Sequence, residues 1–208
     1  VRTVRLQQSG VFRLGDATAP WKPLDATQYF SVDPPGFVWD ARIEVLPLFP
    51  ARVVDMYKAG EGALRAKILS TLSVADQAPS PELNSGELMR YLAEAVWFPT
   101  AFLPGEGVDW GSIDEQSARA TIDHRGTTVS LVFYFNSQNE VERVFAENRY
   151  REVDGTFEPT PWTGRFGNYQ VRNGMIIPLD GEVAWNLPEG DLCYWRGQLV
   201  EIEHQLER

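Results

Sequence analysis

Alternation of apolar and polar positions is the dominant pattern along this chain, and it predicts β-strands with one buried face. In residues 37–46, aromatic and aliphatic side chains occupy every second position, and Asp40, Arg42 and Glu44 lie between them. Shorter runs with a similar period predict further strands. Those runs are residues 4–14, 51–59, 118–122, 129–135, 141–150, 169–177 and 199–205.

Turn-forming residues separate these runs. Asn173-Gly174, between Val171 and Met175, is the strongest hairpin signal because both turn residues tolerate a left-handed backbone. Further turns are expected on the same grounds. They fall at residues 15–16, 60–62, 124–126, 136–139, 180–181 and 196–197.

Proline and glycine also mark segments that do not fit the strand pattern. Residues 20–36 contain four prolines and are predicted to form a constrained loop. Residues 102–110 are rich in glycine and are predicted to be a loop as well. Pro47 and Pro50 bracket a tight corner, and residues 63–73 fit either a strand or a helix.

One convincing helix is predicted, over residues 86–99. Asn84 can cap it, Glu87 can reach back to the amide of the cap, and Pro99 ends it. At 100° per residue the apolar side chains fill an arc of roughly 180°. These side chains are Leu88, Met89, Tyr91, Leu92, Ala95, Val96 and Phe98. A face this wide predicts a helix that lies in a groove rather than on a flat surface.

Glu87, Arg90 and Glu94 share the opposite side of this helix, where Arg90 can pair with either acid at helical spacing. We expect this side to be solvated. If the helix is covered on both sides, Arg90 and Glu94 instead become a buried pair that must satisfy each other and any polar head group.

These elements predict one domain spanning residues 1–208, with about nine to eleven antiparallel strands and a helix in the middle. The fold class is mainly β (α+β). A long antiparallel sheet twists and curls, so we expect a single curved sheet or half-barrel wrapped around the central helix. The first residue is Val1 rather than Met, and we expect the chain to be a trimmed or processed part of a longer one.

Aromatic residues are abundant, with seven Trp, seven Tyr and eleven Phe. Such a number favours a thick core or an aromatic-lined cavity. The side chains expected to line a cavity are mostly aromatic, joined by the two polar residues of the helix. They are Trp39, Tyr57, Arg90, Tyr91, Glu94, Trp97, Phe98, Phe133 and Trp185.

The formal net charge is −10. Sequence-independent nucleic-acid binding needs clustered Lys and Arg, and docking on anionic membranes needs positive charge. We therefore expect the chain neither to bind nucleic acid nor to dock on anionic membranes through its charge. No apolar run approaches the roughly 18 to 20 residues that span a bilayer.

No motif names a reaction. Cys193 is the single cysteine, and His124 and His204 lie far apart, so we expect no metal site and no cofactor. The serines lack the nucleophile-elbow context, and no catalytic residue is assigned. The loop acids beside Trp110 are the one arrangement that resembles the carboxylate pair of a glycosidase. They are Asp109, Asp114 and Glu115.

Two blocks carry a family resemblance: QYFSVDPPGFVW (residues 28–39) and GELMRYLAEAVWFP (residues 86–99). With the closing run, residues 169–202, they resemble a bacterial family of uncharacterised proteins, a domain of unknown function. The second half is also similar to lipoprotein carriers of the LolA and LppX type. That resemblance implies a curved antiparallel half-barrel closed by helices, with an apolar cavity for acyl chains. It implies no reaction, cofactor or catalytic residue.

Three hypotheses for function follow. The first is a non-enzymatic binder of a lipid or another apolar or amphipathic small molecule in the concave face of the sheet. The second is a structural or interaction domain whose interior is filled by its own side chains. The third is a hydrolase that uses the loop carboxylates.

Overall fold

The computed structural model describes residues 1–46, 49–68 and 72–206, and strands dominate it. Thirteen strands form one antiparallel sheet in the order β6-β5-β4-β3-β2-β1-β13-β12-β11-β10-β9-β8-β7. The strands are β1 (Thr3–Arg13), β2 (Trp21–Ser31), β3 (Gly36–Leu46), β4 (Phe49–Lys58), β5 (Glu61–Ile68), β6 (Leu72–Gln77), β7 (Val108–Ser112), β8 (Ser117–His124), β9 (Thr127–Phe135), β10 (Val141–Val153), β11 (Thr156–Arg172), β12 (Met175–Leu187) and β13 (Gly190–Gln205).

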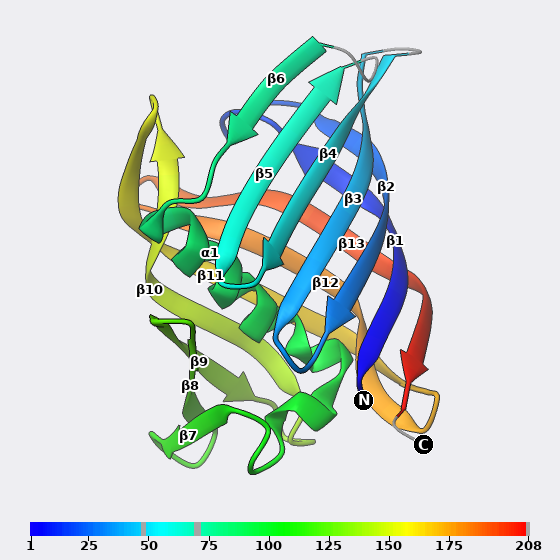
Figure 1. Cartoon of the computed structure of the whole chain (residues 1–208), viewed down its shortest axis with the longest axis vertical. Helices are drawn as coiled ribbons and strands as arrows, with labels where there is room; N and C mark the ends of the chain where they lie inside the picture. Colours follow the sequence, from blue (N-terminus) through cyan, green and yellow to red (C-terminus); the bar gives the residue numbers. More distant parts are fainter. Residues whose placement is uncertain (47–48, 69–71, 207–208) are drawn as a thin grey trace.

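The sheet curls around the helix α1 (Pro81–Glu94), as expected for an antiparallel sheet with this many strands (Figure 1). Strands β3, β4 and β5 contact one side of α1, and β9 and β10 contact another. Two short 3-10 helices continue from α1, namely η1 (Ala95–Trp97) and η2 (Pro99–Phe102). None of the described helices is long and apolar enough to cross a membrane.

The helix begins five residues earlier than predicted, because Ser80 rather than Asn84 is its N-cap. The Ser80 hydroxyl accepts a hydrogen bond from the amide of Leu83 at 3.1 Å. Pro81 follows in the first turn, where its fixed φ suits a helix and its missing N–H costs nothing. Asn84 instead accepts a hydrogen bond from the amide of Gly62 at 2.8 Å, which ties α1 to the start of β5.

The proline-rich segment predicted to be a loop is largely the strand β2. Three of its four prolines lie outside the strand, at residue 20 and in the turn at residues 34–35. Between them every second side chain is buried against the core, and the outward positions are polar or partly exposed. The prediction was wrong because prolines that bound a strand were interpreted as interrupting it.

Two predicted turns, at residues 180–181 and 196–197, lie inside the long strands β12 and β13. Gly181 and Gly197 are direct partners in that ladder. A Cβ on Gly197 would overlap Cζ2 of Trp195. These glycines therefore make room for the Trp195 ring rather than turn the chain. The described residues nevertheless contain more strands than expected, because β2, β6 and β7 lie in or extend into segments that were predicted to be loops or left ambiguous.

The remaining segment predictions are confirmed only in part. The ambiguous residues 63–73 belong to β5 and β6 where they are described, and residues 69–71 lie outside the described part, as does Pro47. Residues 102–110 include the end of η2 and the first part of β7. The hairpin at Asn173-Gly174 is confirmed, and Asn173 has the expected positive φ of 51°.

The core lies between α1 and the concave face of the sheet. Phe30, Phe37, Tyr91 and Phe98 form a connected group of rings, with the Phe30 and Phe98 centroids 4.8 Å apart. Leu88 and Leu92 are completely buried beside them. The wide apolar face predicted for the helix is therefore confirmed, and the concave sheet supplies the groove in which it lies.

Strands near the two ends of the curled sheet, β4 and β8, are in direct contact. The Tyr57 hydroxyl of β4 and Nδ1 of His124 of β8 are 2.9 Å apart. Close by, a Cβ on Gly60 would lie 2.9 Å from Cβ of Arg125, so the two neighbouring turns are in contact. This seam joins strands that are distant in the sheet order.

Candidate functional site

The polar side of α1 is buried in this protein, although the sequence predicted a solvated side. Glu87 is 5% exposed, and the side chains of Arg90 and Glu94 are 17% and 14% exposed. The curled sheet covers the helix on both sides, so the charged side faces strands rather than water. The alternative of a buried Arg90–Glu94 pair is therefore the arrangement found.

Arg90 is the centre of a well-formed ion-pair group. Its Nη1 donates to Asp55 of β4 at 2.6 Å, and its Nε donates to Glu94 at 3.0 Å. Gln28 of β2 donates from Nε2 to the second oxygen of Glu94 at 2.7 Å. The guanidinium also stacks over the ring of Trp39 at 5.0 Å. Burial raises the pKa of Glu94, and the Arg90 charge opposes that shift.

Glu87 lies beside Asp55 in the same buried region. Burial, and then the Asp55 charge, raise the pKa of Glu87 to about 8, although Arg149 and Arg90 act to lower it. A hydrogen bond between the Glu87 and Asp55 carboxyl groups requires a proton on one of them. Without that proton, Oδ1 of Asp55 and Oε2 of Glu87 have no partner among the described residues. A proton on Glu87 would allow the two carboxyl groups to share a hydrogen bond.

A second buried arginine, Arg149, lies on β10. The register of β10 against β11 shifts between Ala146 and Arg149, so a β-bulge interrupts the alternation there. Val144 and Ala146 are buried, the next two residues are exposed, and Arg149 is buried again. The bulge therefore points Arg149 toward the core face, where strict alternation would have placed Asn148.

Arg149 is surrounded by aromatic side chains. Its guanidinium carbon lies 4.9 Å from the ring of Trp162 and 5.6 Å from the ring of Trp185. Its Nη1 donates to the Tyr194 hydroxyl at 3.3 Å, and Nε1 of Trp162 donates to the same oxygen at 3.0 Å. On the helix side, Nη2 lies 3.8 Å from Glu87.

Tyr194 also owes its position to a β-bulge. The register between β12 and β13 shifts between Val183 and Ala184, opposite Tyr194. As a result, Tyr194 and its neighbour Trp195 both pack against the core, although consecutive strand residues normally face opposite ways. Tyr194 stacks on Trp185 at 5.8 Å and meets Phe12 edge-on at 6.0 Å. We call Phe12, Trp185, Tyr194 and Trp195 the aromatic wall.

The structure divides the nine side chains expected to line a cavity. Trp39, Arg90 and Glu94 belong to the buried ion-pair group centred on Arg90, and Trp185 belongs to the aromatic wall. The remaining five are packed in the core. They are Tyr57, Tyr91, Trp97, Phe98 and Phe133. Their polar atoms bond within the protein; for example, Nε1 of Trp97 donates to the Pro178 carbonyl at 3.2 Å.

Sequence reasoning missed Arg149, Glu87, Tyr194 and Trp195. For Glu87 the signal was present, because it shares a helix side with Arg90 and Glu94. For the other three no signal was available, since both bulges arise from strand pairing that a periodic pattern does not reveal.

The chemistry-bearing residues considered for catalysis do not converge. Asp109, Asp114 and Glu115 are exposed. Hydrogen bonds from the Gln116 amide and Ser117 lower the pKa of Asp114, whereas a general acid needs a raised pKa. Within the described residues, no three His, Cys, Asp or Glu side chains are grouped so that they could hold a metal ion.

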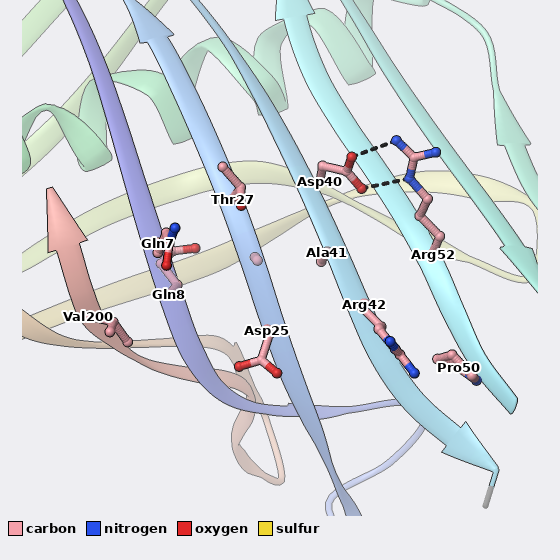
Figure 2. Close-up of a pocket in the computed structure, with 11 residues that line it drawn as sticks. Gln7, Gln8, Asp25, Thr27, Asp40, Ala41, Arg42, Pro50, Arg52 and Val200 are labelled. Atoms are coloured by element: carbon pink, nitrogen blue, oxygen red, sulfur yellow. Dashed lines mark hydrogen bonds and ion pairs between the residues drawn. The ribbon is translucent and has the colours of Figure 1, made fainter. Parts of the chain in front are cut away.

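A groove of about 760 Å³ lies on the outer face of the sheet, away from α1 (Figure 2). Asp25, Thr27, Arg42 and Arg52 are among the residues that line it, and Arg52 binds Asp40 through two hydrogen bonds of 2.8 and 2.6 Å. Most of the side chains that line the groove are polar, and Asp40, one of its two acids, is already paired with Arg52. This groove is not the apolar cavity expected from the sequence.

The architecture defines a LolA-like half-barrel. A LolA superfamily protein from Nitrosomonas europaea aligns with a TM-score of 0.51 and 10% identity, over 100% of this chain and 88% of that protein. A DUF1329 family protein from Desulfovibrio piger aligns with a TM-score of 0.48 and 9% identity, over 98% and 85% of the two chains. The likeness is one of fold.

Residues 1–204 match the family of unknown function DUF6920, and the chain belongs to that family. No curated protein sequence matches the chain. The family expected from the two sequence blocks and the LolA-like architecture are both confirmed.

Proposed function

We propose that this protein is a non-enzymatic binder of an amphipathic, lipid-like molecule. The observation that carries the proposal is the aromatic wall. Its four members pack against the core, yet each is only partly buried. They come from β1, β12 and β13, whereas the strands that α1 chiefly contacts are β3, β4, β5, β9 and β10.

An apolar chain laid on this wall would remove aromatic surface from water. Burial of apolar surface contributes about 25 cal/mol per Å². The rings of Phe12, Tyr194 and Trp185 are in successive contact, so they offer a continuous surface rather than separate patches.

The amphipathic character of the ligand follows from what borders the wall. Arg149 contacts both Trp185 and Tyr194, and it is charged and nearly buried. A chain without a polar group would cover Arg149 and leave its donors without partners, which is costly. A ligand with a polar end avoids that cost. The LolA-like fold supports the shape of such a site, namely a concave sheet face beside a helix.

The test is saturable binding of an environment-sensitive fluorescent fatty acid. Trp185→Ala should weaken binding severalfold because it removes a ring from the wall. Trp110→Ala is the matched control, since Trp110 is 39% exposed and packs on Phe102 and Phe133 instead. Its affinity should equal that of the unmodified protein.

Native mass spectrometry of freshly purified protein provides a second readout, in which a co-purified lipid should appear as a discrete added mass. The competing hypothesis is a structural or interaction domain with a self-filled interior. The complete burial of Phe98 and Phe133 favours it. Absence of saturable probe binding by the native protein would decide for that hypothesis and against the binder.

A further inference from the structure

Arg149 is a buried cation with poor partners. Its five N–H donors make two contacts with described residues, at 3.3 Å to Tyr194 and 3.8 Å to Glu87. Charge-assisted hydrogen bonds are normally about 2.7–2.9 Å long. Its Nε is buried and has no partner among the described residues. Arg90, by contrast, makes contacts of 2.6 and 3.0 Å with two carboxylates.

Tyr194 supplies a further donor at the same place. Its oxygen accepts hydrogen bonds from both Arg149 and Trp162. Both bonds use the oxygen as acceptor, so the hydroxyl hydrogen is left to donate to a third group. Tyr194 and Arg149 therefore present N–H and O–H donors side by side, and the group that would satisfy them is an acceptor.

The charge around Arg149 also favours an anion. Asp55 and Glu94 are both engaged by Arg90. Glu87 is the acid nearest Arg149, and burial together with Asp55 raises its pKa, which favours the neutral form at neutral pH. A protonated Glu87 leaves Arg149 without a counter-ion among the described residues.

We infer that Arg149 and Tyr194 form the receptor for an anionic oxygen head group, a carboxylate or phosphate, of the ligand whose chain lies on the aromatic wall. This inference rests on the proposed function and names the class of ligand. Trp185 connects the two parts, since it stacks on Tyr194 and lies 5.6 Å from the guanidinium. The Arg149 side chain keeps 10% of its surface exposed and the rings beside it are half-buried, so the head group would approach from the side of the aromatic wall.

The experiment compares four amphiphiles with the same alkyl chain, each used below its micelle concentration at neutral pH. They are dodecanoate, dodecyl phosphate, dodecanol and dodecyltrimethylammonium, and each displaces the fluorescent fatty acid. The protein should bind dodecanoate or dodecyl phosphate about tenfold or more tightly than dodecanol, the order expected for a charge-assisted hydrogen bond. The anion that binds more tightly shows whether the head group is a carboxylate or a phosphate.

Two variants locate the preference. Arg149→Gln should reduce the anion-to-alcohol affinity ratio to about one while dodecanol affinity stays within about threefold, because only the charge-assisted bonds are lost. Tyr194→Phe keeps the ring and should reduce the ratio severalfold. Arg143→Gln is the matched control on the same strand, where Arg143 stacks on Tyr134 at 3.7 Å outside the site. Its ratio should be unchanged.

The outcomes separate the inference from the proposed function. A ratio near one in the unmodified protein, a preference for the ammonium amphiphile, or a ratio unaffected by either site variant overturns the inference while dodecanol binding still supports the binder. If Arg149→Gln does not fold, the unmodified ratio and Tyr194→Phe decide. Failure of every amphiphile to bind saturably removes the proposed function and the inference together.

Discussion

Arg149 donates a hydrogen bond to Tyr194 although the two residues are 45 positions apart in the sequence. A β-bulge orients each of the two side chains. The bulge in β10 moves Arg149 from the outer face to the core face. The bulge in β13 directs Tyr194 and Trp195 the same way. Bulges commonly re-aim side chains near functional sites, which agrees with the role inferred for this pair.

The first prediction concerns the contribution of α1 to stability. Leu92 is completely buried between the helix and the sheet. Leu92→Ala should lower the free energy of unfolding by about 2 to 5 kcal/mol, measured by urea denaturation. Leu103→Ala, at a residue that is 54% exposed, should change it by less than about 0.5 kcal/mol. Equal small effects of both variants would mean that α1 is peripheral.

The second prediction is a pH dependence of stability. Asp55, Arg90 and Arg149 face Glu87, and the pKa of Glu87 is raised to about 8. The folded protein thus keeps a proton that the unfolded chain loses near pH 4.3, the approximate pKa of a free Glu. The stabilisation is complete below that lower pKa and is lost as the pH rises through about 8. Its slope is at most about 1.4 kcal/mol per pH unit.

Glu87→Gln tests this dependence because the amide stays neutral and can still donate to Asp55. Urea unfolding between pH 7 and 9, above the lowered pKa values of His124 and His204, should show a flatter slope for Glu87→Gln than for the unmodified protein. Glu142→Gln, at an exposed site on β10, should keep the original slope. Identical slopes in all three proteins would show that Glu87 is ionised when folded.

The third prediction concerns the close approach of β5 to α1. A Cβ on Gly62 would lie 3.0 Å from both the Leu83 carbonyl oxygen and Cγ of Glu87. Gly62→Ala should therefore cost about 1 to 3 kcal/mol through overpacking, measured as a loss of unfolding free energy. The control is Gly111→Ala, since a Cβ there meets nothing within 4 Å. A neutral Gly62→Ala would mean that the helix moves away from β5 without cost.

The fourth prediction concerns the seam between β4 and β8. Tyr57→Phe keeps the buried ring and removes the hydrogen bond to His124. Its loss should lower the unfolding free energy by about 0.5 to 1.5 kcal/mol. Tyr134 lies on the face of β9 that points away from the core. Tyr134→Phe should therefore change the unfolding free energy by less than about 0.5 kcal/mol. Increased amide hydrogen exchange confined to β4 and β8 in Tyr57→Phe would place the loss at the seam; unchanged exchange would contradict it.

The alternation in residues 37–46 predicted β3, and the wide apolar arc of the helix predicted that α1 is surrounded by a curved sheet. These features are local, because a period of two or of 3.6 residues follows from backbone geometry alone. The same reasoning failed for β2, where flanking prolines obscured a strand, and for Gly181 and Gly197, which make room for Trp195. A glycine can also make room for a bulky neighbouring side chain, and a proline can bound a strand, so neither residue identifies a turn by itself.

The sequence by itself determined the class of fold, the burial of Leu88 and Leu92, and the capacity of Arg90 to pair with Glu94. Only the tertiary structure decided that this pair is buried, because covering both sides of α1 depends on how far the sheet curls. It also decided that Arg149 and Tyr194 face inward. A single bulge reverses every side chain beyond it, and its position is set by strand pairing rather than by any local pattern.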